Sequence, residues 1–453
     1  MKSIYPILSI ICLLLVSCGT QHEQKSESVR EQIKAFPERA ADMSIYEVNI
    51  RQYTPEGTFQ AFIPHIQRLS KMGVDILWIM PIQPIGVKNR KGPLGSPYSI
   101  QNYTEVNADC GTIEDFKKLV TEAHQNDMLV ILDWVANHTA WDHDWMDSKP
   151  DYYTTDDDGN VIPPVPDWSD VADLNYDNTE MRQEMIDALK FWIKETDLDG
   201  YRCDVAGEVP MSFWNTAKAE LNKVKDLFML AEGDEPFLHD TAFLMTYGWG
   251  FHHVLNGVAK GEQNADSIDL FLQNDLKRYG TEAIRMNFTT NHDENSWNGT
   301  VFERLGDGAL ALSVIASTVQ GMPLIYSGQE AGLDRRLSFF DKDSIDWTDI
   351  KYEKFYAKLL RLKKDNPALW NGAYGGIPTR VSSDDKVYAF KRSKDNNTVI
   401  CIVNISDQPQ DFNLSDKSIE GTYVDYFVGQ KYTLQVGEKL TLQPWQYLIF
   451  TNK

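Results

Sequence analysis

The chain has 453 residues, and its 44 Lys and Arg are outnumbered by 66 Asp and Glu, so the formal net charge is −22. This charge excludes nucleic acid as a partner, because phosphate backbones are bound by clustered cations, and it disfavours direct binding to anionic membrane surfaces. The 42% of hydrophobic residues is typical of a globular protein, and the length suits roughly two or three domains.

The N-terminus predicts an export signal followed by a lipid anchor. Residues 4–16 form an apolar run that is too short to span a membrane. The run leads into Ser17 and Cys18 and resembles a bacterial lipobox, where a peptidase cuts before the Cys and its thiol receives a lipid. We therefore expect residues 1–17 to be the signal peptide and residues 18–42 to be the lipidated Cys18 with a polar tether. The alternative is an ordinary signal peptide with a chance Cys. The lipid anchor predicts localisation at a bacterial cell envelope, with membrane contact through the lipid alone.

From residue 44 onward, short apolar segments alternate with amphipathic segments. We expect strands at 45–48, 76–80, 129–133, 200–204, 228–232, 242–245, 285–290 and 324–326, and helices at 59–72, 113–126 and 351–366. Eight such alternations over about 330 residues predict an α/β fold, a (β/α)8 barrel, rather than an open doubly wound sheet. The catalytic barrel is assigned to residues 43–372. It includes an irregular insertion after the third strand, residues 138–180, that is rich in Asp, Pro, Tyr and Trp.

The pattern changes in residues 373–453, which alternate in the manner of antiparallel strands. The expected strands are 387–390, 398–403, 422–427 and 446–450. We predict a separate C-terminal antiparallel β-sandwich. It has no clustered titratable residues, so its expected role is to pack against the barrel.

Cysteine usage argues against a disulfide framework. The expected leader and lipid account for Cys12 and Cys18, which leaves Cys110, Cys203 and Cys401 in three distant segments. The sequence has no CxxC, HExxH or GxxxxGK motif, so it gives no support for a zinc peptidase or a nucleotide hydrolase.

The polar residues that follow the expected strands indicate the chemistry. Barrel enzymes carry their catalytic residues at the C-terminal ends of the strands. The expected strand ends carry Asp204, Glu232 and Asp293 together with Arg202 and two histidines, His138 and His292. Two carboxyl groups facing one another suit cleavage of a glycosidic bond, one as acid and one as nucleophile or base.

Arg202 and Asp204 are two residues apart, so they point to the same side of their strand. The Arg cation favours the ionised carboxylate that a nucleophile needs. A Glu in a drier setting, as expected for Glu232, keeps its proton longer and can act as the general acid.

Several segments of the chain match the motifs of one family, in order and at plausible spacing. They are residues 133–138, 172–175, 200–204, 232, 291–293 and 321–330. On these motifs the chain resembles the α-amylase family of glycoside hydrolases, from about residue 44 to the C-terminus. The resemblance implies retaining cleavage of α-glucosidic bonds in starch-like glucans or maltooligosaccharides.

The resemblance also implies roles for individual residues. Asp204 matches the nucleophile, Glu232 the acid/base, and Asp293 the third catalytic carboxylate. The substrate-binding positions of the family are matched by Tyr98 as an aromatic platform beneath the sugar, and by His138, Arg202 and His292. Asn137 and Asp173 match positions that contribute in some members to a calcium site, so calcium is a possible cofactor.

Two positions depart from the family pattern. Many α-amylases carry a Lys-His pair after the nucleophile that contacts the reducing-side sugar, and here Gly207 and Glu208 stand in those places. This leaves the acceptor specificity open. The cleavage chemistry is left intact by these two positions. An α-glucan transglycosylase stays an alternative, because the sequence does not separate water from a sugar as acceptor. A further alternative is a non-catalytic glycan-binding barrel, although such relatives usually lack one of the three carboxylates that are present here. Six Trp residues near the rim are candidates for stacking on sugars or for loop packing: Trp134, Trp141, Trp145, Trp168, Trp249 and Trp297.

Overall fold

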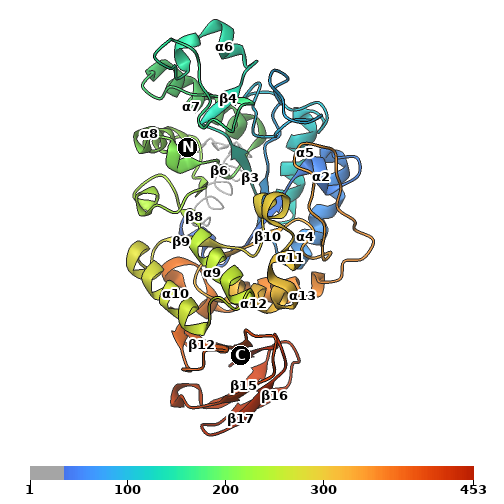
Figure 1. Ribbon diagram of the computed structural model, residues 1–453, viewed down its shortest axis with the longest axis vertical. Helices are drawn as coiled ribbons and strands as arrows, with labels where there is room; N and C mark the ends of the chain where they lie inside the picture. The colour runs from blue at the N-terminus through green and yellow to red at the C-terminus, as the bar shows by residue number, and fades with distance from the viewer. Residues whose placement is uncertain (1–34, 453) are drawn as a thin grey trace, which may run out of the picture.

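The structure is a computed structural model that describes residues 35–452 (Figure 1). The predicted signal peptide, Cys18 and most of the predicted tether lie outside the described residues. Within residues 35–452, no helix is long and apolar enough to cross a membrane.

Eight parallel strands close into a barrel, which confirms the predicted (β/α)8 fold. The first strand pairs with the last, with Ile45 opposite Leu324, and with the second, with Ile45 opposite Ile76. In barrel order the strands are β1 (Ile45–Val48), β2 (Ile76–Ile79), β3 (Leu129–Trp134), β6 (Gly200–Cys203), β7 (Phe228–Ala231), β8 (Met245–Tyr247), β9 (Ile284–Asn287) and β10 (Met322–Tyr326).

Side chains at every second position of a strand point into the barrel. They are apolar in the middle of the barrel and polar at its upper rim. Apolar residues at alternate positions, such as Ile131 and Leu230, form a buried core inside the barrel. Two residues further along the same strands, the inward positions turn polar: Asp133 follows Ile131 and Glu232 follows Leu230. On β6 the inward positions near the rim are likewise polar, first Arg202 and then Asp204 at the end of the strand. The functional side chains are therefore the top layer of the barrel interior.

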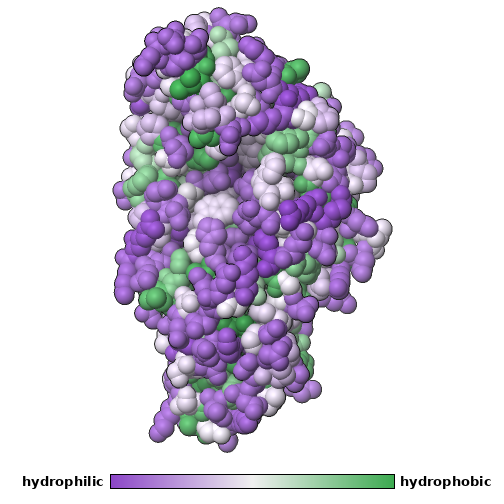
Figure 2. All heavy atoms as spheres, in the orientation of Figure 1, coloured by the Kyte–Doolittle hydropathy of each residue, from purple (hydrophilic) through white to green (hydrophobic). Residues whose placement is uncertain are grey.

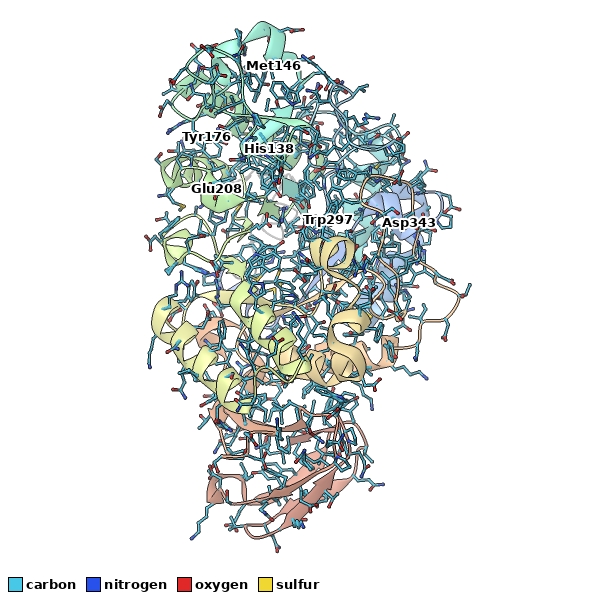
Figure 3. All side chains as sticks on the ribbon, in the orientation of Figure 1. His138, Met146, Tyr176, Glu208, Trp297 and Asp343 are labelled. Carbon is cyan, nitrogen blue, oxygen red and sulfur yellow. The ribbon has the colours of Figure 1, made fainter. Side chains whose placement is uncertain are left out.

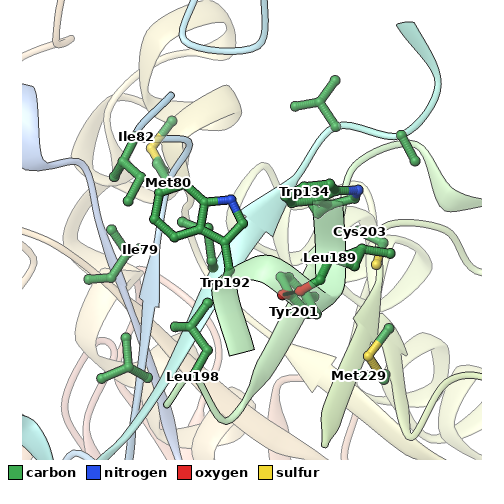
Figure 4. Close-up of a cluster of buried hydrophobic side chains, with 14 of the residues drawn as sticks. Ile79, Met80, Ile82, Trp134, Leu189, Trp192, Leu198, Tyr201, Cys203 and Met229 are labelled. Carbon is green, nitrogen blue, oxygen red and sulfur yellow. Dashed lines mark hydrogen bonds between the residues drawn. The ribbon is translucent and has the colours of Figure 1, made fainter. Parts of the chain in front are cut away.

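Helices cover the outside of the barrel (Figure 1). They are α2 (Ile50–Tyr53), α3 (Phe59–Phe62), α4 (Ile66–Met72), α5 (Ile113–Gln125), α7 (Thr179–Thr196), α8 (Met211–Leu221), α9 (Trp249–Ala259), α10 (Ala265–Tyr279), α11 (Val301–Leu305), α12 (Ala309–Thr318) and α13 (Glu353–Asp365). Figure 4 shows part of the layer between strands and helices, where Trp192 of α7 lies near Leu198 and Tyr201. The Tyr201 hydroxyl donates to the Leu189 carbonyl at 2.5 Å, which satisfies this polar atom inside an apolar layer.

Two expected elements are broken or shifted in the structure, and two more differ in where they end: the strand expected at 285–290 ends at Asn287, and the strand expected at 387–390 extends to Lys394. The helix expected at 59–72 is broken into α3 and α4 by a 3-10 turn, η2 (Ile63–His65), because Pro64 has no N–H for the helical hydrogen bond. The sixth strand is β8 (Met245–Tyr247) and not 242–245. Thr246 faces outward, where its hydroxyl lies 2.8 Å from Nε2 of His239, and this polar residue concealed the strand in the sequence.

The insertion after β3 forms a small lobe at one end of the barrel rim, at the top of Figure 1. It contains β4 (His138–Ala140), α6 (Asp144–Ser148), a 3-10 turn η3 (Pro150–Tyr152) and β5 (Val171–Asp173). Strands β4 and β5 pair in antiparallel fashion, with His138 opposite Asp173. This pairing brings the end of the insertion back to the rim of the barrel.

The C-terminal region is an antiparallel β domain, as predicted. A six-stranded sheet and a two-stranded sheet enclose their own core, which includes Ile402 and Phe412. Four of the eight strands were not expected from the sequence, because they are short and mostly exposed. The strands are β11 (Thr379–Arg380), β12 (Val387–Lys394), β13 (Asn397–Asn404), β14 (Gln410–Asn413), β15 (Gly421–Asp425), β16 (Lys431–Leu434), β17 (Lys439–Leu442) and β18 (Tyr447–Thr451).

This domain packs against helices of the barrel. The guanidinium of Arg392 on β12 is fully buried and donates to the carbonyls of Thr318 and Val319, at 3.1 and 2.8 Å, at the end of α12. Cys401 on β13 is a buried free thiol, as expected for a strand in this core. The contact lies far from the barrel rim, which supports the packing role expected for this domain.

Candidate active site

A cleft of about 380 Å³ opens at the C-terminal end of the barrel. Figure 2 shows the hollow beside the insertion lobe. Its lining residues are Lys91, Ser96, Tyr98, His138, Trp168, Asp170, Val171, Asp204, Val205, Glu232, His292, Asp293, Trp297, Phe339 and Phe340. The cleft therefore brings together all three predicted catalytic carboxylates with Tyr98, His138 and His292, while Arg202 lies buried at its floor.

The Arg202 guanidinium joins three carboxylates. Its Nη1 lies 2.8 Å from Oδ1 of Asp133 and 2.8 Å from Oδ1 of Asp204, and its Nη2 lies 2.9 Å from Oε2 of Glu232. The Arg202 side chain is fully buried, so water screens these pairs very little. One buried cation thus fixes the positions of the two carboxyl groups that the sequence predicts as nucleophile and acid/base.

Both of these carboxyl groups hold their protons more tightly than usual. Burial raises the pKa of Asp204 to about 6, against the opposing charge of Arg202. Burial also raises the pKa of Glu232 to about 7, and the negative charges of Asp204 and Asp293 add to this effect. Between these values Asp204 is largely ionised while Glu232 is largely protonated, which is the division of roles that glycosidic cleavage requires.

The loop after β6 is strained where it meets Glu232. Val205 has φ 36° and ψ 48°, in the left-handed region that a β-branched residue rarely adopts. In this conformation its backbone N–H donates to Oε2 of Glu232 at 2.8 Å. The strain orients a donor toward the candidate acid/base, as often happens at functional sites.

A chain of hydrogen bonds runs beneath the cleft from His292 to Asp133. His292 Nε2 lies 2.9 Å from the Tyr98 hydroxyl, which donates to Oδ2 of Asp133 at 3.0 Å. Nδ1 of His292 contacts the buried carboxylate of Glu47 on β1. Burial opposes a charge on His292, but Asp293 and Glu47 outweigh it and raise its pKa to about 9. His292 is therefore an imidazolium that donates from both ring nitrogens at neutral pH.

The remaining predicted residues line the upper part of the cleft. Asp293 is the most exposed of the three carboxylates, with 33% of its side chain accessible, and its Oδ2 lies 3.3 Å from Nε2 of His292. Burial lowers the pKa of His138 to about 4, so this ring is neutral and offers one donor and one acceptor. Both side chains are placed to contact a ligand in the cleft.

The geometry gives no support to the calcium prediction at Asn137 and Asp173. Nδ2 of Asn137 lies 3.3 Å from Nδ1 of His138, so the Asn137 amide is already engaged with that ring. Ca²⁺ takes about six to eight oxygen ligands. Within residues 35–452, no group of three or more His, Cys, Asp or Glu side chains is placed to hold a metal ion. The described residues thus give no support for the ion, and no step below uses it.

Several residues of the site were not singled out in the sequence. Trp78 donates from Nε1 to Oδ2 of Asp133 at 3.1 Å, and the Tyr247 hydroxyl accepts from Nε of Arg202 at 3.1 Å. Glu47 is completely buried in the middle of an apolar strand. That placement was a usable signal, because a carboxylate at an inward strand position needs a charged partner.

The six Trp residues near the rim were candidates for stacking on sugars or for packing, and the structure contains both kinds. Trp168 and Trp297 line the cleft and are 36% and 51% exposed. Trp134 is fully buried between Tyr103 and Tyr201. Trp141, Trp145 and Trp249 do not line the cleft and pack as partly buried side chains against the hydrophobic core.

Comparison with family models decides the classification. The model of the α-amylase catalytic domain matches residues 28–161 and 166–382, which is most of the chain. The chain belongs to the α-amylase family. It is therefore a glycoside hydrolase by family, and residues 379–449 match the C-terminal domain of maltogenic amylase.

Individual relatives agree with this assignment. The chain is 28% identical to alpha-amylase MalA of Haloarcula japonica over 82% of its own length, but it spans only 57% of that relative. It is 24% identical to the maltogenic alpha-amylase of Bacillus acidopullulyticus, over 85% of this chain and 69% of the relative.

Solved structures show the same fold. A noncanonic maltogenic alpha-amylase, AmyB, from Thermotoga neapolitana superposes with a TM-score of 0.83 at 30% identity, covering 91% of this chain and 98% of that one. An alpha-amylase from Lactobacillus plantarum gives a TM-score of 0.80 at 30% identity, covering 90% and 98%. The barrel and the C-terminal domain are thus shared over nearly the whole described chain.

Proposed function

We propose that this protein hydrolyses α-glucosidic bonds of starch-like glucans or maltooligosaccharides with retention of configuration. The observation that carries the proposal is the shared guanidinium of Arg202, which contacts both Asp204 and Glu232 at the ends of adjacent barrel strands. This arrangement brings the two carboxyl groups close to one another, and retaining glycosidases in general hold their two carboxyl groups about 5–5.5 Å apart. The substrate class is supported by relatives that are named alpha-amylase, maltogenic alpha-amylase and cyclomaltodextrinase.

In the first step, an oxygen of ionised Asp204 bonds to the anomeric carbon of the bound sugar. The bond from that carbon to the glycosidic oxygen breaks, and this oxygen takes the proton of Glu232. In the second step, water attacks the anomeric carbon, gives a proton to Glu232 and displaces Asp204. Two inversions at one carbon return the α configuration, so the released reducing end is an α-anomer.

Other residues of the cleft are proposed to position the sugar. Tyr98 lies against the floor of the cleft, held by Asp133 and His292, so its ring is a rigid platform for the sugar undergoing cleavage. The neutral His138 ring and Asp293 offer donors and acceptors to the sugar hydroxyls. The His292 imidazolium, whose N–H groups are directed at Glu47 and Tyr98, positions Tyr98 and Asp293 beside the sugar. Arg202 acts through Asp204, because its charge keeps that carboxyl ionised within a dry site.

A product time course separates hydrolysis from the two alternatives. Starch, pullulan, maltotriose and sucrose are incubated with the protein, and the products are resolved by length. The proposal expects shorter glucans with one new reducing end for each bond cleaved. Products longer than the maltotriose supplied would indicate transfer to a sugar acceptor, and a complete lack of turnover would indicate a glycan-binding protein.

The pKa values predict a narrow pH optimum. Activity should rise as Asp204 ionises near pH 6 and fall as Glu232 deprotonates near pH 7, giving a bell-shaped profile of kcat/KM on maltooligosaccharides. A maltosyl fluoride releases fluoride without help from an acid. Its kcat/KM should therefore still rise near pH 6 but should no longer fall near pH 7. Identical profiles for both substrates would mean that Glu232 does not protonate the leaving group.

The acceptor side of the cleft, which receives the reducing-side sugar, differs from many α-amylases at Gly207 and Glu208. Both residues are exposed, and a Cβ added to Gly207 would lie 3.1 Å from Oε2 of Glu235. A Lys at 207 could therefore be held by Glu235 while it contacts the sugar. A hydrogen bond to a neutral sugar is worth about 0.5–1.5 kcal/mol, so Gly207→Lys combined with Glu208→His should raise kcat/KM on maltoheptaose relative to maltotriose by up to about tenfold. An unchanged ratio would show that these positions do not face the substrate.

We also propose that the mature protein is held at a bacterial cell envelope by a lipid on Cys18, since the lipobox-like sequence supplies one acceptor thiol. Replacing Cys18 by Ser should release the chain from membranes or leave it unprocessed. The measurement is the membrane and soluble distribution of the full chain in a bacterial host, with Cys110→Ser as the matched control. Unchanged maturation and membrane fractionation of the Cys18→Ser variant would exclude the anchor.

A further inference from the structure

The position of Glu232 sets the direction in which a sugar chain crosses the cleft. In the proposed function Glu232 protonates the bond to the leaving sugar, so that sugar lies beyond Glu232, over the 3-10 turn η4 (Ala206–Glu208) and Glu235. The part of the chain on the non-reducing side of the bond, here called the donor side, must lie the opposite way. Figure 3 shows Glu208 and Trp297 on opposite sides of the region beneath His138. The donor side therefore points toward Trp297 and Phe340.

A loop of residues 84–100, between β2 and α5, stands at the donor end of the cleft. One attachment of this loop is to the insertion lobe, where Nζ of Lys91 lies 3.0 Å from Oδ1 of Asp170 and 2.5 Å from the carbonyl oxygen of Asp167. Lys91 and Asp170 both line the cleft. Their ion pair joins the loop to the insertion at the edge of the cleft.

The second attachment is to residues 339–340, on the other side of the cleft. The N–H of Leu94 donates to the Phe340 carbonyl at 3.0 Å. Arg51 joins the same two segments, because its guanidinium donates to the carbonyls of Gly95 and Phe339, at 3.0 and 2.6 Å. Gly92 has φ +65°, and a Cβ there would lie 2.5 Å from Cβ of Phe340, so this close approach depends on glycine.

The loop is also braced along its own length. The N–H of Gly86 donates to the Ser99 carbonyl at 2.9 Å, and the N–H of Val87 donates to Oδ2 of Asp142 at 2.8 Å. Nη2 of Arg90 donates to the Ile85 carbonyl at 2.8 Å. The bonds at its base, its middle and both flanks make the loop a fixed wall.

We propose that this wall, closed by the Lys91–Asp170 ion pair, limits the donor side to a short segment, so the enzyme removes short units from non-reducing ends. The inference rests on the proposed function. The cleft volume of about 380 Å³ is near the lower end of the range of about 300–1,000 Å³ for ligand clefts, which suits a short length of sugar chain. The ammonium of Lys91 and the carboxylate of Asp170 also provide a donor and an acceptor for the hydroxyls of a terminal sugar.

The test compares two maltoheptaosides that carry the same ultraviolet-absorbing group at the reducing end, and cleavage is followed by chromatographic separation of the labelled products. One has a free non-reducing end, and the other has this end blocked by a 4,6-O-ethylidene group. We expect kcat/KM of the parent protein to be at least about tenfold higher on the free substrate, because a blocked terminus does not fit against the wall. Initial products from unmodified maltoheptaose should include short units released from the non-reducing end.

Replacing Lys91 by Ala should open the wall. We expect this variant to lower the free-to-blocked ratio severalfold and to lengthen the first products. The matched control is Lys88→Ala, an exposed lysine in the same loop, which forms no side-chain ion pair within residues 35–452 and should leave the ratio unchanged.

Two results would overturn the proposal. One is equal cleavage of the free and blocked substrates by the parent protein. The other is a Lys91→Ala variant with the parent's ratio and product lengths. If the parent cleaves neither the maltoheptaosides nor maltoheptaose, the proposed function itself is wrong. That outcome differs from the two results above, in which the substrates are cleaved but the wall does not limit the donor side.

Discussion

Replacing Asp204 by Asn is expected to reduce hydrolysis of maltooligosaccharides by about 10⁴-fold or more, as for removal of other enzymatic nucleophiles. Asn has the same shape, and its amide oxygen can still accept the hydrogen bond from Nη1 of Arg202, so the fold should persist. Glu232→Gln should lower the rate by about 10²–10⁴-fold, the usual contribution of a general acid or base. The measurement is kcat/KM on maltoheptaose, with thermal unfolding recorded for each variant.

The two variants should differ in how they respond to an added nucleophile. With Glu232→Ala and an activated glycosyl fluoride, azide should restore turnover, because it attacks the glycosyl-enzyme without needing a general base. Azide should not restore turnover to Asp204→Asn in the same way, since no intermediate forms. Glu180→Gln, at an exposed position in the first turn of α7, is the matched control and should behave as the parent. Parent-like turnover of Asp204→Asn or Glu232→Gln would contradict the assignment of roles.

Replacing Arg202 by Met should have the largest combined effect on stability and activity. The change leaves Asp133, Asp204 and Glu232 without the cation that contacts all three. Breaking a buried ion pair by removing one partner costs about 3–5 kcal/mol in the free energy of unfolding. The pKa of Asp204 should also rise further, so residual activity should shift to higher pH.

Arg392→Met is the matched control for loss of a buried guanidinium. Arg392 is equally buried but contacts backbone carbonyls such as that of Val319. Its replacement should also lower the denaturant concentration at which half of the protein is unfolded. The activity of the folded protein should keep the pH dependence of the parent. If Arg202→Met retained the parent profile and turnover, Arg202 would have only a structural role.

The layer of candidate catalytic residues could be predicted, because its side chains follow the two-residue alternation of the strands. Arg202 and Asp204 lie two residues apart on β6 and contact each other at 2.8 Å, as alternation requires. The same rule, applied to β1 and β3, would have found Glu47 and Asp133 as inward polar residues. Glu47 was overlooked because it lies in mid-strand and outside the family motifs, whereas Asp133 begins one of those motifs but was given no role of its own.

The geometry of the loops could not be predicted from the sequence. The Lys91–Asp170 pair joins residues far apart in the chain, and neither stands in a family segment or on a strand. The positive φ of Val205 is imposed by the turn around it and is unfavourable for a valine considered alone. The short strands of the C-terminal domain were hidden for a related reason, since a mostly exposed strand has no strong apolar pattern.

The anomeric configuration of the first product tests the central claim most directly. Proton NMR can follow the hydrolysis of a maltooligosaccharide from the first minutes, before mutarotation mixes the anomers. The double displacement by Asp204 and water predicts that the newly formed reducing end appears first as the α-anomer. A β-anomer as the first product would mean a single displacement by water, and Asp204 could not then be the nucleophile.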